Sequence, residues 1–218
     1  MEKHIIIFFL ICSGFTNLLA QKLKTINDTI SYAAGVSIAT SFQRHGVGQL
    51  DIDLVNQAIR DILSKDSSFH KLSKAEGELI FNNYLTDTKS KKGRDFLREN
   101  AKKEGVVSLP SGLQYKILKS GGSLQKPTVK NSVKVHYEGR LIDGKIFDSS
   151  SNRGEPVTFP IDKVIKGWIE GIPLMSVGDQ FEFYIPYELA YGERGVQGKI
   201  PPYATLIFYV ELLEIIPE

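Results

Sequence analysis

The chain has 218 residues, enough for one large domain or two small ones, and its 42% hydrophobic and 24% charged content is that of a globular protein. A formal net charge of +2 lacks the basic excess that nucleic-acid binding usually requires, so we expect no nucleic-acid partner. The short cluster of Lys89, Lys91 and Lys92 is more typical of a solvated helix face than of a binding patch.

Residues 1–20 have the layout of a secretory signal peptide. Lys3 precedes an apolar run over residues 5–11, and Ala20 provides a small residue at the end of the segment. The run is much shorter than the roughly 20 residues of a membrane span, so we expect no span. We predict cleavage after Ala20 and export, with the periplasm as the favoured destination. Cys12, the only cysteine, is an alternative lipid-anchor site, although Ile11 before it is a poor match.

The next region, residues 27–104, is helical in pattern. Apolar residues from Ile30 to Phe42 recur at steps of three and four, and Gly46 follows as a stop signal. Either Asp51 or Asp53 can cap a second helix, which carries a broad apolar stripe. Two amphipathic helices are therefore predicted before residue 64.

A third and longer helix is predicted from a capping box formed by Ser73 and Glu76. We expect it to extend to about Lys103, with Gly93 as a weak point. Three helices cannot bury this much apolar surface alone, because small domains bury only about 60% of their chain surface. A second copy of the same unit, giving a homodimer, is the simplest way to cover the remaining apolar surface. A monomeric helical cap folded against the C-terminal part of the chain is the alternative.

Beyond Gly105 the periodicity changes from helix to strand. Apolar and polar residues alternate with period two, as in antiparallel strands with one covered face, over residues 133–138, 180–185 and 205–212. Asp143 and Gly144, between apolar runs, indicate a tight hairpin, and a short helix containing Trp168 interrupts the strands. The predicted α+β chain has a signal peptide (1–20), a helical domain with a connecting helix (21–104), and a curved antiparallel sheet wrapped on one short helix (105–218).

Four segments of the C-terminal region place many aromatic side chains around one aspartate, Asp148. They are VHYEGRLIDGKIFDSS (135–150), IKGWIEGIPLMSVG (165–178), AYGERG (190–195) and IPPYATLIFYVELL (200–213). The segments offer no nucleophile, metal-ligand cluster or phosphate-binding loop. Such a site suits a reaction that makes and breaks no covalent bond, for example rotation about a prolyl peptide bond.

In this order, the segments resemble the FKBP-type peptidyl-prolyl cis-trans isomerases. With the preceding helices and ENAKKEGV (99–106), the chain resembles the exported, dimeric Mip/FkpA-like branch of that family. The resemblance implies the FKBP fold, with a proline-binding pocket between the helix and the sheet. It also implies which residues form the site. The catalytic set is Phe147, Asp148, Ile165 and Tyr191, and the substrate-binding set is Tyr137, Phe159, Val164, Trp168, Ile200 and Phe208.

The resemblance also implies a role for each group. Trp168 forms the floor of the pocket, the Ile165 backbone N–H and the Tyr191 hydroxyl hold substrate carbonyl groups, and Asp148 orients the twisting amide, with Tyr137 and Arg153 as its partners. Taken singly, these residues also have structural interpretations, since a lone tryptophan is usually core and an aspartate before serines is often a turn cap. Their joint occurrence in one order favours the functional interpretation.

Four further positions have a smaller bearing on the predicted function. His136 falls on the face opposite Tyr137 and is interpreted as structural. The chain departs from many family members at Val157, where an aromatic wall is common, and at Val196 and Lys199 in the loop over residues 192–200. These departures affect the expected substrate preference and the expected affinity for macrolide inhibitors.

We therefore predict a prolyl isomerase that needs no cofactor or metal and acts on proline-containing unfolded or partly folded polypeptides among exported proteins. A non-catalytic holdase that grips unfolded segments in the cradle of a helical dimer is the alternative from a different class. A structural surface protein with a degenerate pocket is a third interpretation.

Overall fold

The computed structural model describes residues 23–64, 68 and 70–217, and the signal peptide expected over residues 1–20 lies outside them. The chain divides by its contacts into two compact units, Met1–Arg44 and His45–Glu218. Among the described residues, no helix is both long enough and apolar enough to cross a membrane.

The first unit contains α1 (Ile26–Arg44), a helix over the residues where the sequence predicts one. The Asp28 carboxylate accepts hydrogen bonds from the backbone N–H groups of Lys24 and Thr25, each at 3.0 Å, and so satisfies free donors at the start of the helix. No residue of α1 is buried, and Ile30 is 61% exposed. The helix therefore forms without covering its own apolar residues.

Two further helices open the second unit. The first, α2 (Ile52–Leu63), is capped by Asp51 rather than Asp53, because the Asp51 carboxylate accepts the N–H groups of Asp53 and Leu54 at 2.9 and 3.1 Å. The second, α3 (Lys74–Asn100), begins with the predicted capping box and ends slightly before the expected residue. The predicted helix order is confirmed.

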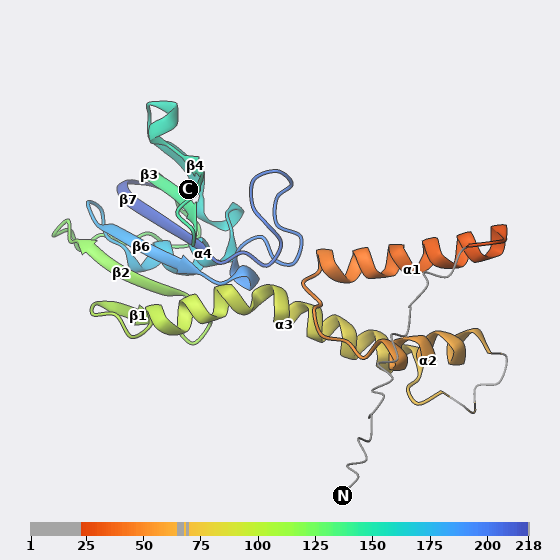
Figure 1. Ribbon diagram of the computed structural model, residues 1–218. Helices are drawn as coiled ribbons and strands as arrows, with labels where there is room; N and C mark the ends of the chain where they lie inside the picture. The colour runs from red at the N-terminus through yellow and green to blue at the C-terminus, as the bar shows by residue number, and fades with distance from the viewer. Residues whose placement is uncertain (1–22, 65–67, 69, 218) are drawn as a thin grey trace, which may run out of the picture. The chain divides into compact units, whose positions relative to one another are not determined.

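Seven antiparallel strands form one sheet in the order β1-β2-β6-β7-β3-β4, with β5 paired to β3 (Figure 1). The strands are β1 (Val106–Ser108), β2 (Gln114–Lys119), β3 (Ser132–Leu141), β4 (Ile146–Ser149), β5 (Val157–Pro160), β6 (Gln180–Ile185) and β7 (Leu206–Ile216). The predicted hairpin at Asp143 and Gly144 joins β3 to β4, and the Leu141 N–H donates to the Lys145 carbonyl at 2.9 Å to close it.

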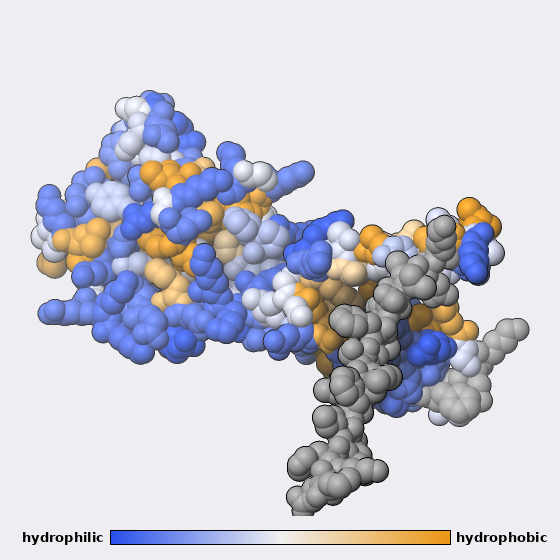
Figure 2. All heavy atoms as spheres, in the orientation of Figure 1, coloured by the Kyte–Doolittle hydropathy of each residue, from blue (hydrophilic) through white to orange (hydrophobic). Residues whose placement is uncertain are grey.

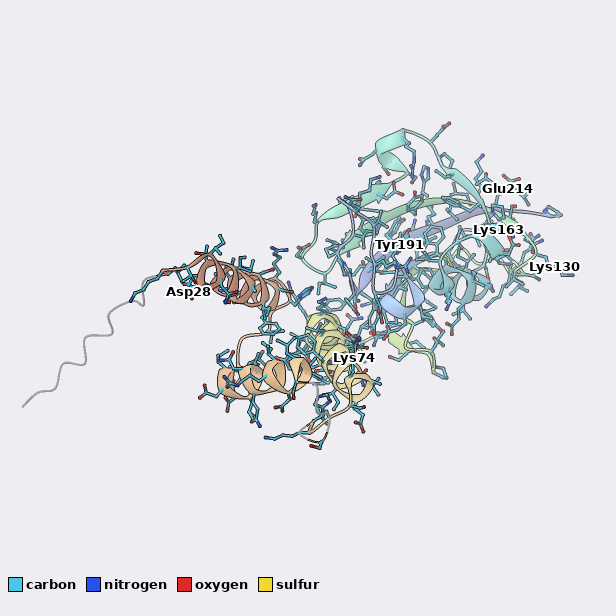
Figure 3. The ribbon with its side chains drawn as sticks, turned by 90° about the vertical axis from the view of Figure 1, so that its right-hand side faces the viewer. Asp28, Lys74, Lys130, Lys163, Tyr191 and Glu214 are labelled. Carbon is cyan, nitrogen blue, oxygen red and sulfur yellow. The ribbon has the colours of Figure 1, made fainter. Side chains whose placement is uncertain are left out.

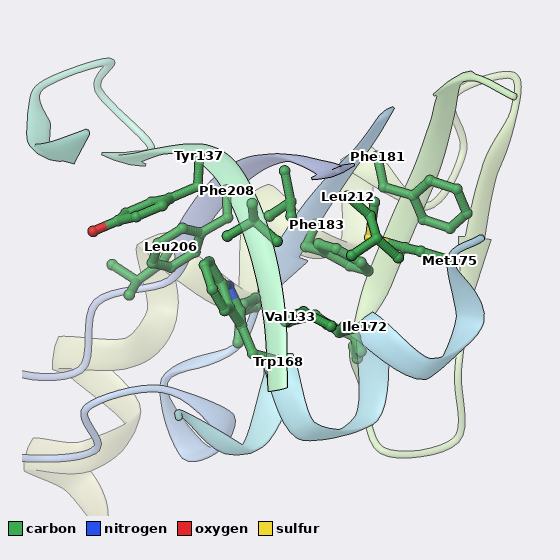
Figure 4. Close-up of a cluster of buried hydrophobic side chains, with 14 of the residues drawn as sticks. Val133, Tyr137, Trp168, Ile172, Met175, Phe181, Phe183, Leu206, Phe208 and Leu212 are labelled. Atoms are coloured by element: carbon green, nitrogen blue, oxygen red, sulfur yellow. The ribbon is translucent and has the colours of Figure 1, made fainter. Parts of the chain in front are cut away.

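One short helix, α4 (Lys166–Gly171), packs against the inner face of the sheet, as the sequence predicts. Figure 4 shows Trp168 and Ile172 from this region facing Phe183, Leu206 and Phe208 of the sheet. The remaining connections contain short 3-10 helices. They are η2 (Ser151–Arg153), η3 (Ile161–Lys163), η4 (Ile172–Leu174) and η5 (Tyr187–Leu189). The core thus lies between one sheet face and the α4 region.

The outer face of the sheet is also covered in part, by the C-terminal half of α3. Tyr184 and Ile207, which the period-two pattern places outward, are only 6% and 7% exposed. The Phe96 ring of α3 lies 6.1 Å from the Tyr184 ring, between centroids. A Cβ at Gly93 would lie 2.4 Å from the Thr205 hydroxyl oxygen, so only glycine allows this approach. The residue that the sequence marks as a weak point is therefore a packing contact.

Candidate functional site

A cavity of about 400 Å³ opens between α4 and the sheet in the second unit. It is lined by Tyr137, Phe147, Asp148, Phe159, Lys163, Val164, Ile165, Trp168, Tyr191 and Phe208. These residues come from four strands, from η3 and the segment that leads into α4, from α4 itself, and from the loop after η5. Lys163 and Tyr191 are labelled in Figure 3.

Aromatic rings form the floor and walls of this cavity. Trp168 is 4% exposed, and the rings of Tyr137, Phe159 and Phe208 each meet it edge to face at centroid distances of 5.3–5.7 Å. Phe147 meets Phe208 in the same way at 5.5 Å. Edge-to-face pairs restrict each other's orientation and are worth about 0.5–1.5 kcal/mol beyond the area that they bury. The cavity is therefore held open by a connected aromatic cluster.

A glycine on β3 makes room for two of these rings. Gly139 pairs in register with Asp148 on β4 and with Phe208 on β7. A Cβ at this position would lie 2.6 Å from the Phe147 ring and 2.7 Å from the Phe208 ring. Both walls can approach the strand only because position 139 has no side chain.

The one carboxylate of the cavity is fixed by three donors. The Tyr137 hydroxyl donates to Asp148 Oδ2 at 2.6 Å, and Arg153 Nη2 and the Ser149 N–H each donate to Oδ1 at 3.0 Å. Arg153 also donates to the Tyr137 hydroxyl. The Asp148 side chain keeps 42% of its surface exposed, so it stands at the rim of the cavity rather than in the core. A negative charge is therefore held in a defined place above the aromatic floor.

Two tyrosines of the cavity stay protonated to unusually high pH. Burial raises the pKa of Tyr137 well above its usual range, and its hydrogen bond to Asp148 raises it further. Burial also raises the pKa of Tyr191, with a smaller contribution from the charge of Asp148. Because the neutral form is the donor, both hydroxyls remain donors at physiological pH.

Two donors at the cavity have no partner among the described residues. Ile165 is the N-cap of α4; its carbonyl accepts from Trp168 and Ile169, but its own N–H makes no hydrogen bond to the part of the chain that the structure describes. The same holds for the Tyr191 hydroxyl. These two groups are available to carbonyl oxygens of a bound peptide.

All the expected site residues except Ile200 line this cavity. Ile200 is 5% exposed and borders a neighbouring hollow, in a loop that an antiparallel bridge between Val196 and Ile200 closes. Lys163 lines the cavity and was not expected from the sequence, since a single exposed lysine carries no pattern. His136, interpreted as structural, lies 3.1 Å from the Ser150 hydroxyl through its Nδ1 atom and is absent from the cavity lining. Among the described residues, no group of three or more His, Cys, Asp or Glu side chains is placed to hold a metal.

Two family models match the chain. One is described as an FKBP-type peptidyl-prolyl cis-trans isomerase and matches residues 124–213, which include the whole cavity. The other is described as the domain amino-terminal to FKBP-type peptidyl-prolyl isomerases and matches residues 27–117.

Named relatives align over most of the chain. The FKBP-type 22 kDa peptidyl-prolyl cis-trans isomerase of Escherichia coli (strain K12) is 47% identical over 94% of this chain and 87% of its own. The peptidyl-prolyl cis-trans isomerase Mip of Coxiella burnetii is 38% identical over 98% of each chain. The crystal structure of FkpA from Escherichia coli is 34% identical, has a TM-score of 0.56 and covers 90% of this chain and 99% of that one. The chain therefore belongs to the FKBP-type peptidyl-prolyl cis-trans isomerase family.

Proposed function

We propose that the cavity binds the proline ring of a client polypeptide and that the residues around it speed rotation of the peptide bond before that proline. The observation that supports this is an apolar hollow of about 400 Å³ with one fixed carboxylate and, at its edge, two donors that have no partner among the residues that the structure describes. Rotation about a peptide bond must overcome a barrier of about 18–20 kcal/mol. Before proline, the cis and trans forms differ by only about 0.5–1 kcal/mol, so lowering the barrier serves both directions.

The aromatic lining supports catalysis through desolvation. The planar amide has resonance, which places more negative charge on its oxygen than the twisted amide carries, so water stabilises the planar form more. An apolar cavity removes that preference and favours the twisted form. An acceleration of roughly 10⁵-fold requires about 7 kcal/mol of such differential stabilisation, at about 1.4 kcal/mol for each factor of ten.

The polar groups supply orientation. Asp148, held by Tyr137 and Arg153, keeps a negative charge beside the rotating amide. A nearby negative charge repels the oxygen of the planar amide more than that of the twisted amide, so it acts in the same direction as desolvation. In this proposal, the Ile165 N–H and the Tyr191 hydroxyl hold flanking carbonyl groups, while Trp168 supports the proline ring.

A protease-coupled assay on a short X-Pro peptide tests these roles. We expect Tyr191→Phe and Asp148→Ala each to lower kcat/KM by about ten-fold or more, because each removes one polar contact to the rotating segment. Tyr209→Phe is the matched control, since Tyr209 lies on β7 but does not line the cavity. A double variant of Tyr191 and Asp148 that kept the full rate would overturn the assignment.

We also propose that residues 21–104 form a dimerisation domain and residues 105–218 the isomerase domain. Apolar side chains on the helices support this: Leu54, Ile62 and Leu79 are 53–62% exposed. Leu54 and Ile62 border a groove of about 380 Å³ between α2 and the start of α3. Figure 2 shows hydrophobic residues exposed at the surface of these helices. A homodimer would carry two prolyl sites and raise the effective concentration of a client held at one of them.

Light scattering of the chain beginning at Gln21 tests the assembly. We expect the mass of a dimer, and we expect Ile62→Asp to reduce it to that of a monomer, because the substitution places a charge in the apolar groove. Lys119→Asp on β2 is the control and should leave the mass unchanged. A monomeric parent chain would favour the helical cap instead.

The same groove favours holdase activity as a second candidate function, because an apolar groove can grip an unfolded segment without catalysis. A client chain without proline separates the two functions. Suppression of its aggregation, lost in Ile62→Asp and kept in Asp148→Ala, would support a holdase. No suppression would leave isomerisation as the only activity.

Export is proposed from residues 1–20, and a relative from Legionella longbeachae, 38% identical over 90% of this chain, is named outer membrane protein MIP. The mass of the chain recovered from the periplasm tests cleavage. We expect a mature chain that begins at Gln21. A lipid on Cys12 would add the mass of the acyl chains and support the anchor instead.

A further inference from the structure

A second hollow lies in the isomerase domain, bounded by two of the segments that line the prolyl cavity. It has a volume of about 430 Å³ and contains the apolar side chains of Leu141 and Ile200, which are 7% and 5% exposed. Three cationic residues also line it: Lys145 from the β3–β4 hairpin, and Arg194 and Lys199 from the loop before β7. The hollow therefore combines an apolar base with a positively charged rim.

No acidic residue lines this hollow among the described residues. The acidic residues nearest to these cations in the sequence are Asp143 and Glu193. The Asp143 carboxylate accepts the backbone N–H of Lys145 at 3.0 Å, and neither it nor Glu193 forms a salt bridge with the three cations. Within the part of the chain that the structure describes, the side-chain nitrogens of Lys145, Arg194 and Lys199 form no ion pair or hydrogen bond. The positive charge is therefore available to a ligand.

The same two segments connect this hollow to the prolyl cavity. Phe147, a wall of the cavity, follows Lys145 by two residues, and Tyr191 precedes Arg194 by three. The Gly195 N–H donates to the Tyr191 carbonyl at 3.1 Å, so the loop turns directly from one site to the other. The lining residues of the two sites are thus two and three residues apart along these segments, and an extended peptide advances about 3.3 Å per residue, so we expect a client chain to pass from one site to the other within a few residues.

We propose that this hollow is a subsite for an acidic side chain of the client, a few residues from the proline that is being isomerised. The proposal rests on the assignment of the prolyl cavity given above. The cations attract the carboxylate, and the apolar base accommodates the methylene groups or an apolar neighbour of the acidic residue. The subsite does not change the reaction. It selects which X-Pro bonds of the client enter the prolyl cavity.

A set of peptides with one central X-Pro bond tests the proposal, each with Glu or with Gln at the second, third or fourth residue on either side. For the parent enzyme in low salt, we expect kcat/KM to be about five-fold higher for Glu than for Gln at one or more of these positions, as for a few exposed ion pairs. The preference should fall above about 0.1 M salt, where the screening length is about 10 Å. Equal values for Glu and Gln at every position would overturn the subsite.

Two triple variants locate the effect. Lys145→Gln, Arg194→Gln and Lys199→Gln together should reduce the ratio of Glu to Gln to about one. The matched control, Lys119→Gln, Lys130→Gln and Lys134→Gln, removes the same charge elsewhere on this domain and should keep the ratio. A ratio that survives the first triple, or falls equally in both, would overturn the proposal. A parent enzyme that isomerises neither peptide would instead contradict the prolyl site itself.

Discussion

Replacing Gly139 by alanine tests whether the positions of the aromatic walls control catalysis. Gly139 lies on β3 directly beside Phe208 of β7, and the Phe147 ring covers it from β4. Its φ is not positive, so the backbone itself accepts alanine without strain. Any effect of the added methyl group must therefore come from contact with the two rings.

The size of the effect follows from the contact distances. The new Cβ would lie 2.6 Å from Phe147 and 2.7 Å from Phe208, so each ring would have to move by about 0.7–0.8 Å to regain an ordinary contact of 3.4 Å. Overpacking of this kind costs about 1–3 kcal/mol of unfolding free energy. The rings can relieve the contact only by moving away from the strand, and a displacement near 1 Å at a catalytic site can cost about 100-fold in rate. We expect Gly139→Ala to lower kcat/KM by about 10- to 100-fold.

The protease-coupled assay measures the rate, and urea unfolding followed through Trp168, the only tryptophan, measures stability. Gly77→Ala in α3 is the control, because nothing lies within 4 Å of its added Cβ. Adding Phe147→Leu to Gly139→Ala removes one of the two clashing rings, so it should recover stability without recovering the rate. If Gly139→Ala loses stability but keeps the full rate, the rings are not the walls that position the substrate.

Two further predictions follow from contacts described above. Gly93→Ala should lower the urea midpoint, because the added Cβ would lie 2.4 Å from the buried Thr205 hydroxyl. In an exposed helix the same change usually raises stability by about 1 kcal/mol, as we expect for Gly77→Ala. A raised midpoint for Gly93→Ala would therefore contradict the packing. The raised pKa of Tyr137 means that its contribution to stability is complete below about pH 10, the ordinary pKa of tyrosine, and is lost as pH rises through the higher folded value. Urea midpoints between pH 8 and 11 should therefore fall above about pH 10, and less steeply in Tyr137→Phe; identical curves would refute this.

Local patterns predicted most of the fold because they act over short distances. The capping box at Ser73 and Glu76 and the turn at Asp143 and Gly144 involve residues that are adjacent in the chain, so the sequence alone indicates them. The inward residues of β3, Val133 and Val135, follow from period two. These predictions needed no knowledge of which elements meet.

Contacts between distant elements were not predictable in this way. The period-two pattern places Tyr184 on the outer face of the sheet, yet Tyr184 is buried because α3 covers the sheet at that point. The sequence alone marks Gly93 as a weak point of the helix. In the structure, the side chain of Thr205, more than a hundred residues later, occupies the space beside it. Within the site, the resemblance placed Ile200 in the substrate-binding set, but in the structure it borders the next hollow, a placement that depends on the fold of the loop before β7.

The cover that α3 provides over Tyr184 and Ile207 has a practical consequence for anyone transplanting the catalytic module. The end of the helix and the sheet share one interior, with the Asn100 amide donating to Gln114 at 3.0 Å beneath the surface. A fragment that starts at Gly105 would expose this apolar surface to water, which would favour aggregation. A fragment that starts at Gly93 keeps the final turns of α3, and we expect it to remain folded.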